Sequence, residues 1–266
     1  TLGPELLRAG LPRTLGQIPG NQLLQLSIEE KQLVIPRLPR ELDGLRIAHL
    51  TDLHMSGRIG RAYFEQLVQL TLDSKPDVVA VTGDLVEYPP QMDWVPETLA
   101  RLAAPEGVFF VLGNHDLKID HQQLRQDLHE AGQVDLGSNT HNTSWRGVPV
   151  QLVGNELPWF KPAGTPQRKD AKLAIALTHS PDQFGWAHQH DLDLMLAGHN
   201  HGGQIRFPLL GAVVTPSVYG TRFASGVFKR GNTVMHVSRG AGSLAPLRFL
   251  CPPELAILTL CCSQQS

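Results

Sequence analysis

The feature that most limits how this chain can fold is a recurring pattern in which a short apolar run ends in polar side chains. Residues 107–112 form one such run, and a glycine ends it before Asn114, His115 and Asp116. A run of this kind is typical of a buried strand, and ligands bind at the carboxyl ends of strands in open α/β sheets. For any single run, an ordinary polar turn remains the alternative, because Gly, Asn and Asp are common turn residues.

The same pattern occurs at two earlier points in the chain. A predicted strand at residues 45–51 is followed by Asp52 and His54, and a second at residues 77–82 is followed by Asp84. Helices are predicted at residues 61–74, 92–104 and 121–131. This alternation of strands and helices predicts a largely parallel sheet covered by helices.

Beyond Gly132 strands dominate, and two of them again lead into histidines. His179 follows a predicted strand at residues 172–178, and His199 and His201 follow one at residues 192–196. Further strands are predicted at residues 148–153, 213–215, 226–229, 233–237 and 255–260, with a short helix at residues 181–188. We expect a second, mixed or antiparallel sheet that packs against the first.

The N-terminal residues lack the pattern of apolar runs followed by polar residues. Residues 1–21 mix Leu with Pro, Gly and Arg without periodicity, which predicts a loosely ordered arm with at most one short helix. Residues 23–27 and 32–35 predict the two strands of a hairpin. We therefore expect residues 1–44 to form an arm and hairpin packed on a domain of residues 45–266.

Composition excludes several classes of protein and site. The formal net charge of −2 gives no broad basic field, so duplex nucleic acid is not an expected partner. Cys251, Cys261 and Cys262 show no Cys-x-x-Cys spacing, which excludes a disulfide framework and a cysteine-based zinc site. The sequence contains no apolar run of about 18 residues, so it predicts no membrane span. We expect a monomer that is cytoplasmic or peripheral to the inner membrane, and the start at Thr1 leaves open the loss of an upstream anchor or signal.

The polar residues that follow the strands offer oxygen and imidazole donors, which suit Mn²⁺, Fe²⁺/³⁺, Zn²⁺ or Co²⁺. Seven of them are candidate ligands: Asp52, His54, Asp84, Asn114, His179, His199 and His201. Seven donors are too many for one ion with an open substrate position, but they suit two ions sharing a carboxylate, an arrangement that serves in-line phosphoryl chemistry. Taken singly, such an Asp is usually a helix cap. Lone histidines are usually surface or hydrogen-bonded residues, as we expect for His49, His121, His129, His141, His188, His190 and His236.

Five motifs together carry a resemblance to a known family. They are T-D-L-H at 51–54, T-G-D-L at 82–85, L-G-N-H-D at 112–116, T-H-S-P-D at 178–182 and A-G-H-N-H-G-G-Q at 197–204. This set closely resembles the calcineurin-like metallophosphoesterase superfamily. The last motif, Tyr219-Gly220, S-R-G at 238–240 and C-P-P-E at 251–254 are similar to a narrower branch. That branch includes bacterial membrane-associated phosphodiesterases and UDP-2,3-diacylglucosamine hydrolases.

The resemblance implies a four-layer α/β/β/α sandwich of two mixed sheets flanked by helices, with the site at the strand ends. It implies that Asp52, His54 and His201 hold one metal ion. Asp84 would bridge to a second ion, held by Asn114, His179 and His199. His115 would face the leaving group, and Asp116 would orient it, either through the backbone turn or by fixing the imidazole tautomer.

We therefore expect hydrolysis of a phosphate ester, most of all a phosphodiester, by in-line attack of a metal-bridging hydroxide. The substrate is expected to be a small-molecule or lipid-linked phosphoester, with peripheral membrane association left open. A phosphomonoesterase and a UDP-2,3-diacylglucosamine-type pyrophosphate hydrolase of lipid A synthesis remain alternatives. The second alternative needs an apolar groove near the site, for which Phe207, Pro208, Leu209, Leu210 and Phe223 are the candidates. A non-enzymatic scaffold is disfavoured, because the ligand set is complete.

Overall fold

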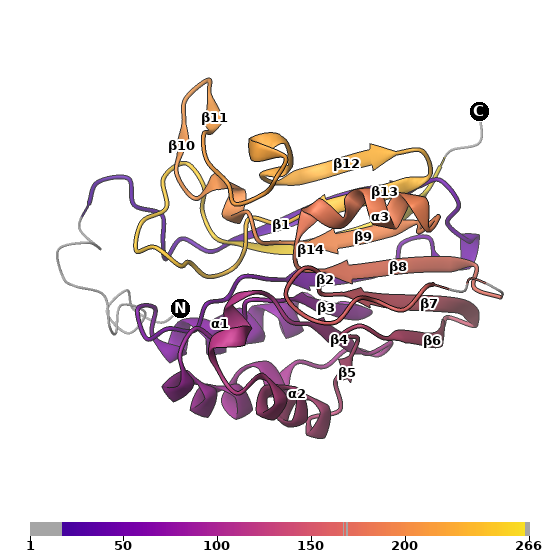
Figure 1. Ribbon diagram of the computed structural model, residues 1–266, viewed down its shortest axis with the longest axis horizontal. Coiled ribbons are helices and arrows are strands. Elements are labelled where there is room, and N and C mark those ends of the chain that lie inside the picture. Colours follow the sequence, from indigo (N-terminus) through magenta and orange to yellow (C-terminus); the bar gives the residue numbers. More distant parts are fainter. Residues whose placement is uncertain (1–17, 167, 169, 264–266) are drawn as a thin grey trace.

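The first and last strands of the described chain lie side by side in one sheet (Figure 1). The structure is a computed structural model that describes residues 18–166, 168 and 170–263. In it, β1 (Ser27–Ile35) runs parallel to β14 (Glu254–Cys262), which pairs antiparallel with β2 (Arg46–Leu50). The sheet continues, parallel to β2, through β3 (Val78–Thr82), β4 (Val108–Val111) and β5 (Val134–Asp135). The strand order is thus β1-β14-β2-β3-β4-β5.

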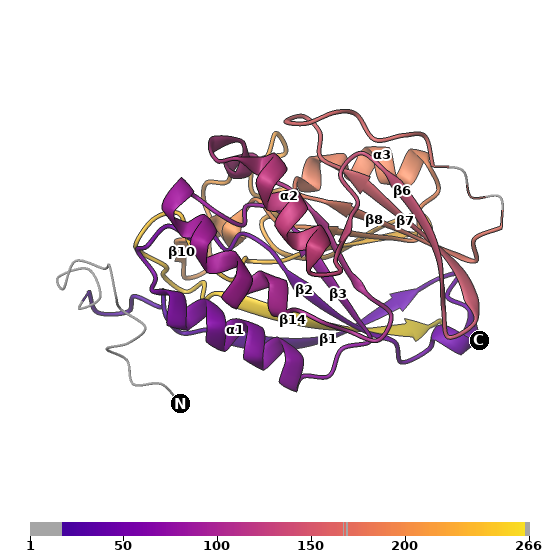
Figure 2. The same ribbon diagram turned by 90° about the horizontal axis from the view of Figure 1, so that it is seen from below.

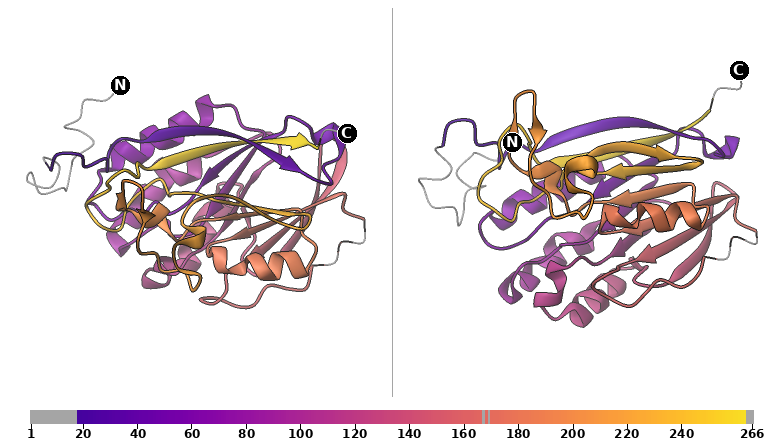
Figure 3. Two further views of the ribbon diagram at one scale, coloured as in Figure 1. Left: turned by 90° about the horizontal axis from the view of Figure 1, so that it is seen from above. Right: turned by 45° about the horizontal axis from the view of Figure 1, so that its top comes forward.

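A second sheet has the order β12-β13-β9-β8-β7-β6. Its strands are β6 (Thr140–Trp145), β7 (Val148–Asn155), β8 (Leu173–Thr178), β9 (Leu194–Ala197), β12 (Gly226–Arg230) and β13 (Thr233–Val237). The four inner strands are parallel, whereas β6 and β12 pair antiparallel with their neighbours. Both sheets are therefore mixed. A separate short hairpin, β10 (Arg206–Phe207) and β11 (Gly211–Ala212), projects from the body (Figures 1 and 3).

Helices cover the outer faces of the two sheets and complete four layers. The helices α1 (Arg61–Asp73) and α2 (His121–Glu130) lie on the first sheet, and α3 (Phe184–Gln189) lies on the second (Figures 1 and 2). Three apolar clusters fill the spaces between these layers. The predicted four-layer α/β fold is confirmed.

Alternation along β2 shows how the strand sequence builds these layers. Ala48 and Leu50 pack in the cluster that contains Phe64 of α1, while Ile47 packs between the sheets with Ile175 of β8. Successive side chains of a strand point to opposite faces, so a strand that is covered on both faces has to be apolar throughout. Burying each such aliphatic or aromatic side chain contributes about 1.5–3 kcal/mol.

The predicted hairpin at residues 23–35 is wrong. One continuous strand, β1, occupies residues 27–35, and its partner is the far end of the chain. The stretch Ile28–Lys31 contains no Gly, Asn or Pro that would favour a tight turn. Its charged residues instead suit an edge strand, where they discourage pairing with other chains. The predicted arm at residues 1–21 falls mostly outside the described residues.

Two further local predictions are wrong, and four strands, β5, β6, β10 and β11, were not predicted. Instead of an α-helix at residues 92–104, the chain forms 3₁₀ turns at Pro89–Glu97 and Leu99–Arg101, because three prolines in the first turn-forming stretch remove backbone donors. Residues 213–215 do not form a strand, and the short hairpin precedes them. The strands β5 and β6 were missed because β5 is very short and β6 has a polar sequence. Within the described residues, no helix is long and apolar enough to cross a membrane.

Candidate metal centre

The predicted site residues lie in the loops that follow the carboxyl ends of β2, β3, β4, β8 and β9. Five of them adopt left-handed backbone angles: Asp52, His54, Asp84, His199 and His201 have φ between 46° and 69°. This region costs a non-glycine residue about 1–3 kcal/mol and is concentrated at functional sites. Glycines allow the loops to approach closely, because a Cβ at Gly113 would collide with the carboxylate of Asp84.

One group of side chains that could hold a metal ion consists of Asp52, His54 and His201. The His201 Nε2 atom lies 3.3 Å from Oδ1 of Asp52 and 3.0 Å from Nε2 of His54. The Asp52 carboxylate is fully buried and also accepts the backbone N–H of His199 at 3.0 Å. All three side chains therefore converge on one small volume.

A second group consists of Asp84, His179 and His199. Oδ2 of Asp84 lies 3.2 Å from Nε2 of His179, which is in turn 3.2 Å from Nδ1 of His199. The same Asp84 oxygen lies 3.5 Å from Nε2 of His54 in the first group. A third group, His54, Asp84 and His115, shares residues with the other two, and the Asp84 carboxylate thus lies between them.

Hydrogen bonds on the far side of two imidazoles leave the nitrogens that face the site free to bind an ion. Nδ1 of His179 is 2.8 Å from the carbonyl oxygen of Thr82, and Nδ1 of His54 is 3.0 Å from Glu87. A donor at Nδ1 leaves a lone pair on Nε2, as is usual for metal-binding histidines. Burial lowers the pKa of His179, but the nearby carboxylate of Asp84 outweighs it and raises the pKa to about 9. The Asp84 carboxylate thus favours a positive charge at Nε2 of His179, and a metal ion bound there would take the place of the proton.

Asn114 provides an independent test of whether the site suits metal ions. Its Oδ1 atom is buried and has no hydrogen-bond partner among the described residues. Buried amide oxygens nearly always have a donor, so an unpaired one calls for an explanation. An oxygen ligand aimed at a cation supplies that explanation, and the surrounding donors are the oxygen and imidazole types that suit transition metals. The residues present therefore fit metal ions.

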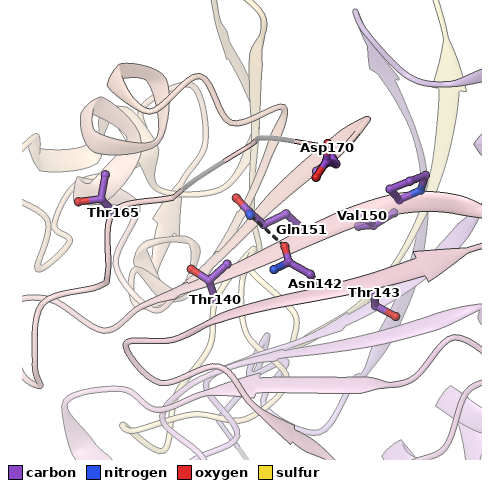
Figure 4. A pocket seen from close by; sticks show the side chains of 9 residues that line it. Thr140, Asn142, Thr143, Val150, Gln151, Thr165 and Asp170 are labelled. Atoms are coloured by element: carbon purple, nitrogen blue, oxygen red, sulfur yellow. Dashed lines mark hydrogen bonds between the residues drawn. The ribbon is translucent and has the colours of Figure 1, made fainter.

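The two groups open into a cavity of about 390 Å³, lined by Asp84, Asn114, His115, His199 and His201 together with apolar side chains. A larger pocket of about 510 Å³ lies over β6 and β7 (Figure 4). Its labelled side chains are mainly neutral, and two of them, Gln151 and Asn142, are hydrogen bonded at 3.0 Å. The pocket over β6 and β7 is the larger of the two. The titratable groups and candidate ligands gather at the cavity beside Asp84, however, and we therefore take that cavity as the site.

Comparison with known proteins agrees with this geometry. A family model of calcineurin-like phosphoesterases matches residues 45–203. The chain belongs to the calcineurin-like phosphoesterase family. It is therefore a phosphoric ester hydrolase.

The relatives of this phosphoesterase include proteins from bacteria and from an animal. The metallophosphoesterase YkuE of Bacillus subtilis is 31% identical over 84% of this chain and 81% of its own. Phosphodiesterase YaeI of Escherichia coli is 30% identical over 81% of this chain and 82% of its own. A transmembrane protein with a metallophosphoesterase domain from Danio rerio is 27% identical over 88% of this chain and 57% of its own.

Glu87 is a residue of this phosphoesterase site that the sequence analysis missed. Its buried carboxylate faces Nδ1 of His54 at 3.0 Å, Nδ1 of His115 at 2.7 Å and Nζ of Lys118 at 2.6 Å. Burial raises the pKa of Glu87, but hydrogen bonds from His54 and Lys118 outweigh it and lower the pKa to about 2. The only signal in the sequence was its position three residues after Asp84.

Asp116 acts on the backbone of the phosphoesterase loops. Its carboxylate accepts backbone N–H groups of Asp84, Leu85, Val86 and Gly113 at 2.8–3.1 Å. The sequence left open whether Asp116 orients His115 through the backbone turn or by contacting its imidazole. The contacts of Asp116 are with the backbone, and the carboxylate next to the His115 imidazole belongs to Glu87. Burial and the nearby Asp84 raise the pKa of Asp116 to about 6.

Arg248 is a second residue that the sequence did not reveal. Its guanidinium is fully buried, and Nη2 donates to the carbonyl oxygens of Arg239 at 2.8 Å and Gly242 at 2.7 Å. The same nitrogen lies 3.2 Å from Nδ1 of His201. Arg248 thus holds the loop behind this metal-binding histidine.

The histidines expected to be non-ligands lie outside the metal-binding groups. His49 and His236 are nevertheless fully buried between the sheets, where their Nδ1 atoms are 3.0 Å apart and Nε2 of His49 is 2.8 Å from Oγ1 of Thr82. The remaining five, His121, His129, His141, His188 and His190, are exposed or half-buried.

Proposed function

We propose that this phosphoesterase hydrolyses phosphodiesters with two divalent or trivalent ions of Mn, Fe or Zn. The observation that carries the proposal is the position of Asp84, whose carboxylate faces both His54 and His179. In this assignment Asp84 would contact both ions. Asp52, His54 and His201 would hold one ion, and Asn114, His179 and His199 would hold the other. When bound, such a pair supplies Lewis-acid activation of water and offsets charge on the phosphoryl oxygens.

His115 is assigned as the group that protonates the leaving oxygen. It lines the cavity, and its backbone N–H donates to Oδ1 of Asp84 at 2.8 Å, which places the residue beside the bridging carboxylate. Burial lowers the pKa of His115, and the charges of Asp84 and Glu87 oppose that effect. The net effect is still a lowered pKa, because His54 and Lys118 add to the effect of burial. The Glu87 carboxylate at Nδ1 works against that lowering and towards the imidazolium form, in which Nε2 would carry the proton to be donated.

The preference for a diester is supported by the name of the relative from Escherichia coli, a phosphodiesterase. Monoesterase activity would use the same residues, and so would pyrophosphate hydrolysis of a UDP-sugar lipid. Of the residues considered for an apolar groove, Phe223 packs in the core beneath the second sheet, whereas Leu209 and Leu210 are exposed. The apolar residues at the site itself are Val214, Pro216 and Leu244, which line the cavity, and Trp159, whose ring lies 5.0 Å from that of His199.

The deciding experiment is a panel of a bis-aryl phosphodiester, an aryl monophosphate and a UDP-sugar lipid, assayed with purified protein and added Mn²⁺. We expect the highest kcat/KM on the diester. A higher kcat/KM on the monophosphate or the nucleotide lipid would replace the diester assignment with the corresponding alternative. The monomeric state and the cellular location stay predictions, and light scattering of the purified protein tests the first.

A further inference from the structure

The hairpin β10–β11 carries apolar side chains that contact little of the protein. Leu209 at its tip is fully exposed, and Leu210 is 75% exposed. Phe207 on β10 is about half exposed, and Val214, just after β11, is 72% exposed. The hairpin stands away from the two sheets in Figures 1 and 3. Exposed apolar groups gathered at one place mark an interaction surface.

This apolar surface is continuous with the catalytic cavity. Val214 and Leu244 line the cavity opposite Asn114 and His199 and are themselves exposed. The base of the hairpin is joined to the segment of Leu244, because the backbone N–H of Arg206 donates to the carbonyl oxygen of Phe249 at 2.9 Å. The segment that follows the hairpin, with Val214 and Pro216, therefore connects the hairpin to the mouth of the cavity.

The stretch of sequence that contains the hairpin is basic. No Asp or Glu occurs between Asp193 and Glu254, while the same stretch contains Arg206, Arg222, Lys229, Arg230, Arg239 and Arg248. Arg248 is fully buried and Arg239 pairs with Glu29 and Glu254, so the other four form the basic rim. The chain as a whole has a formal net charge of −2, so its charge is strongly segregated. Arg222, Lys229 and Arg230 are exposed and share a hollow of about 440 Å³ with Tyr219.

The shape and charge together select one kind of partner. A protruding tip with outward-facing leucines suits a deformable apolar phase, whereas a protein partner would need a matching groove. A second copy of this chain would bring its own cations against these cations, and like charges across an interface are repulsive. A bilayer with anionic headgroups accommodates both the leucines and the basic rim, since juxtamembrane Lys and Arg are attracted to anionic lipid.

We propose that the hairpin tip, residues 207–210 with Val213, Val214 and Val218, inserts into the surface of an anionic lipid bilayer. The rim of Arg206, Arg222, Lys229 and Arg230 binds the lipid headgroups. The cavity mouth then opens at the headgroup layer, so the substrate class is an amphiphilic phosphoester presented by that layer. The membrane docking does not depend on the proposed phosphodiesterase function, whereas the substrate class rests on it.

The test is co-sedimentation of the full chain with phosphatidylcholine vesicles, with and without phosphatidylglycerol. The wild-type protein is expected to bind the anionic vesicles and to bind neutral ones weakly. The Arg222→Gln/Lys229→Gln/Arg230→Gln variant should lower partitioning onto anionic vesicles about 100-fold. The Leu209→Ser/Leu210→Ser variant should lower it at least about tenfold. The matched control, Ile28→Ser/Val34→Ser, removes two exposed apolar residues of β1 and should bind like wild type.

A parallel assay separates docking from catalysis. Hydrolysis of a soluble bis-aryl phosphodiester should be unchanged in both hairpin-region variants, which also shows that they are folded. Equal vesicle binding by wild type and both variants would overturn the docking surface, as would loss of binding on deletion of residues 1–17 alone. Intact vesicle binding without cleavage of any phosphoester would overturn the proposed function and leave the docking standing.

Discussion

At the scale of single residues, Glu87 makes the sharpest prediction, because one buried carboxylate faces a metal-binding histidine, the assigned acid and a lysine. Glu87→Gln keeps the size but removes the charge and one acceptor. Metal affinity or kcat should fall about 10- to 100-fold, the usual effect of removing a group that orients a metal-binding histidine. Titration calorimetry with Mn²⁺ and steady-state kinetics provide the two measurements.

The control for this variant is Glu97→Gln. Glu97 is exposed and pairs with Arg61 at 2.6 Å, so its loss should change little. Wild-type metal affinity and kcat in the Glu87 variant would mean that the contacts of Glu87 have no functional consequence.

His115 gives a second prediction at this scale. His115→Ala should keep its metal content and lose about 10²- to 10⁴-fold in kcat on substrates with alkoxide leaving groups. This loss corresponds to roughly 3–5 kcal/mol. Nitrophenolate needs a proton far less, so the slope of log kcat against leaving-group pKa should steepen.

His121→Ala is the matched control, since His121 packs against Phe160 at a ring distance of 5.3 Å and does not belong to the metal-binding groups. Loss of metal in the His115 variant, or an equal loss of rate for all leaving groups, contradicts the acid role and indicates a structural one.

The residue types after the strands were enough to predict which side chains gather, because parallel strands deliver their following loops to one edge. They could not reveal Glu87 or Arg248. Each has a long side chain that extends to the site from a segment with no distinctive sequence pattern. Arg248 also lies about fifty residues after His201, the histidine that it contacts. Contacts of that kind depend on how loops pack, which one sequence does not show.

At the scale of elements, Asp116 joins the loop after β3 to the loop after β4. Asp116→Ala leaves four backbone N–H groups without their acceptor in a buried place. The free energy of unfolding should fall by about 3 kcal/mol or more. Urea denaturation measures it, and Asp120→Ala is the control, a surface helix cap whose loss costs about 1 kcal/mol.

A change in stability no larger than that of the Asp120 control would mean that the loops hold their shape without Asp116. A loss of activity without a loss of stability would mean that Asp116 acts mainly by orienting His115.

The sequence predicted strands correctly where both faces of the strand are covered by other layers. It failed where the structure of a segment depends on a partner far away in the sequence. β3 and β4 are buried throughout and apolar except for Thr82, because sheet and helix layers enclose them. β1 was mistaken for a hairpin because its partner β14 lies at the other end of the sequence. The prolines of residues 89–96 changed an apolar helical pattern into 3₁₀ turns, which shows that local breakers outweigh periodicity.

At the scale of the whole molecule, the two groups of ligands predict a metal count. Elemental analysis of the purified active protein should find two transition-metal ions per chain, and chelation should abolish activity. Asp84→Ala should lose both ions and Asp52→Ala mainly one, because Asp84 lies between the groups and Asp52 belongs to one. Loss of a single ion from the Asp84 variant would contradict a bridging role, and a fully active metal-free protein would contradict the centre itself.

The pairing of β1 with β14 has a consequence for how the protein is made. The ribosome delivers β1 early, but β14 separates it from β2 and leaves the tunnel only after the rest of both sheets. Until then the nascent chain holds an unpaired strand at its beginning and an open edge at β2, the kind of surface that invites wrong pairing. A stalled or prematurely terminated product therefore lacks its final strand and, with it, the attachment of its first.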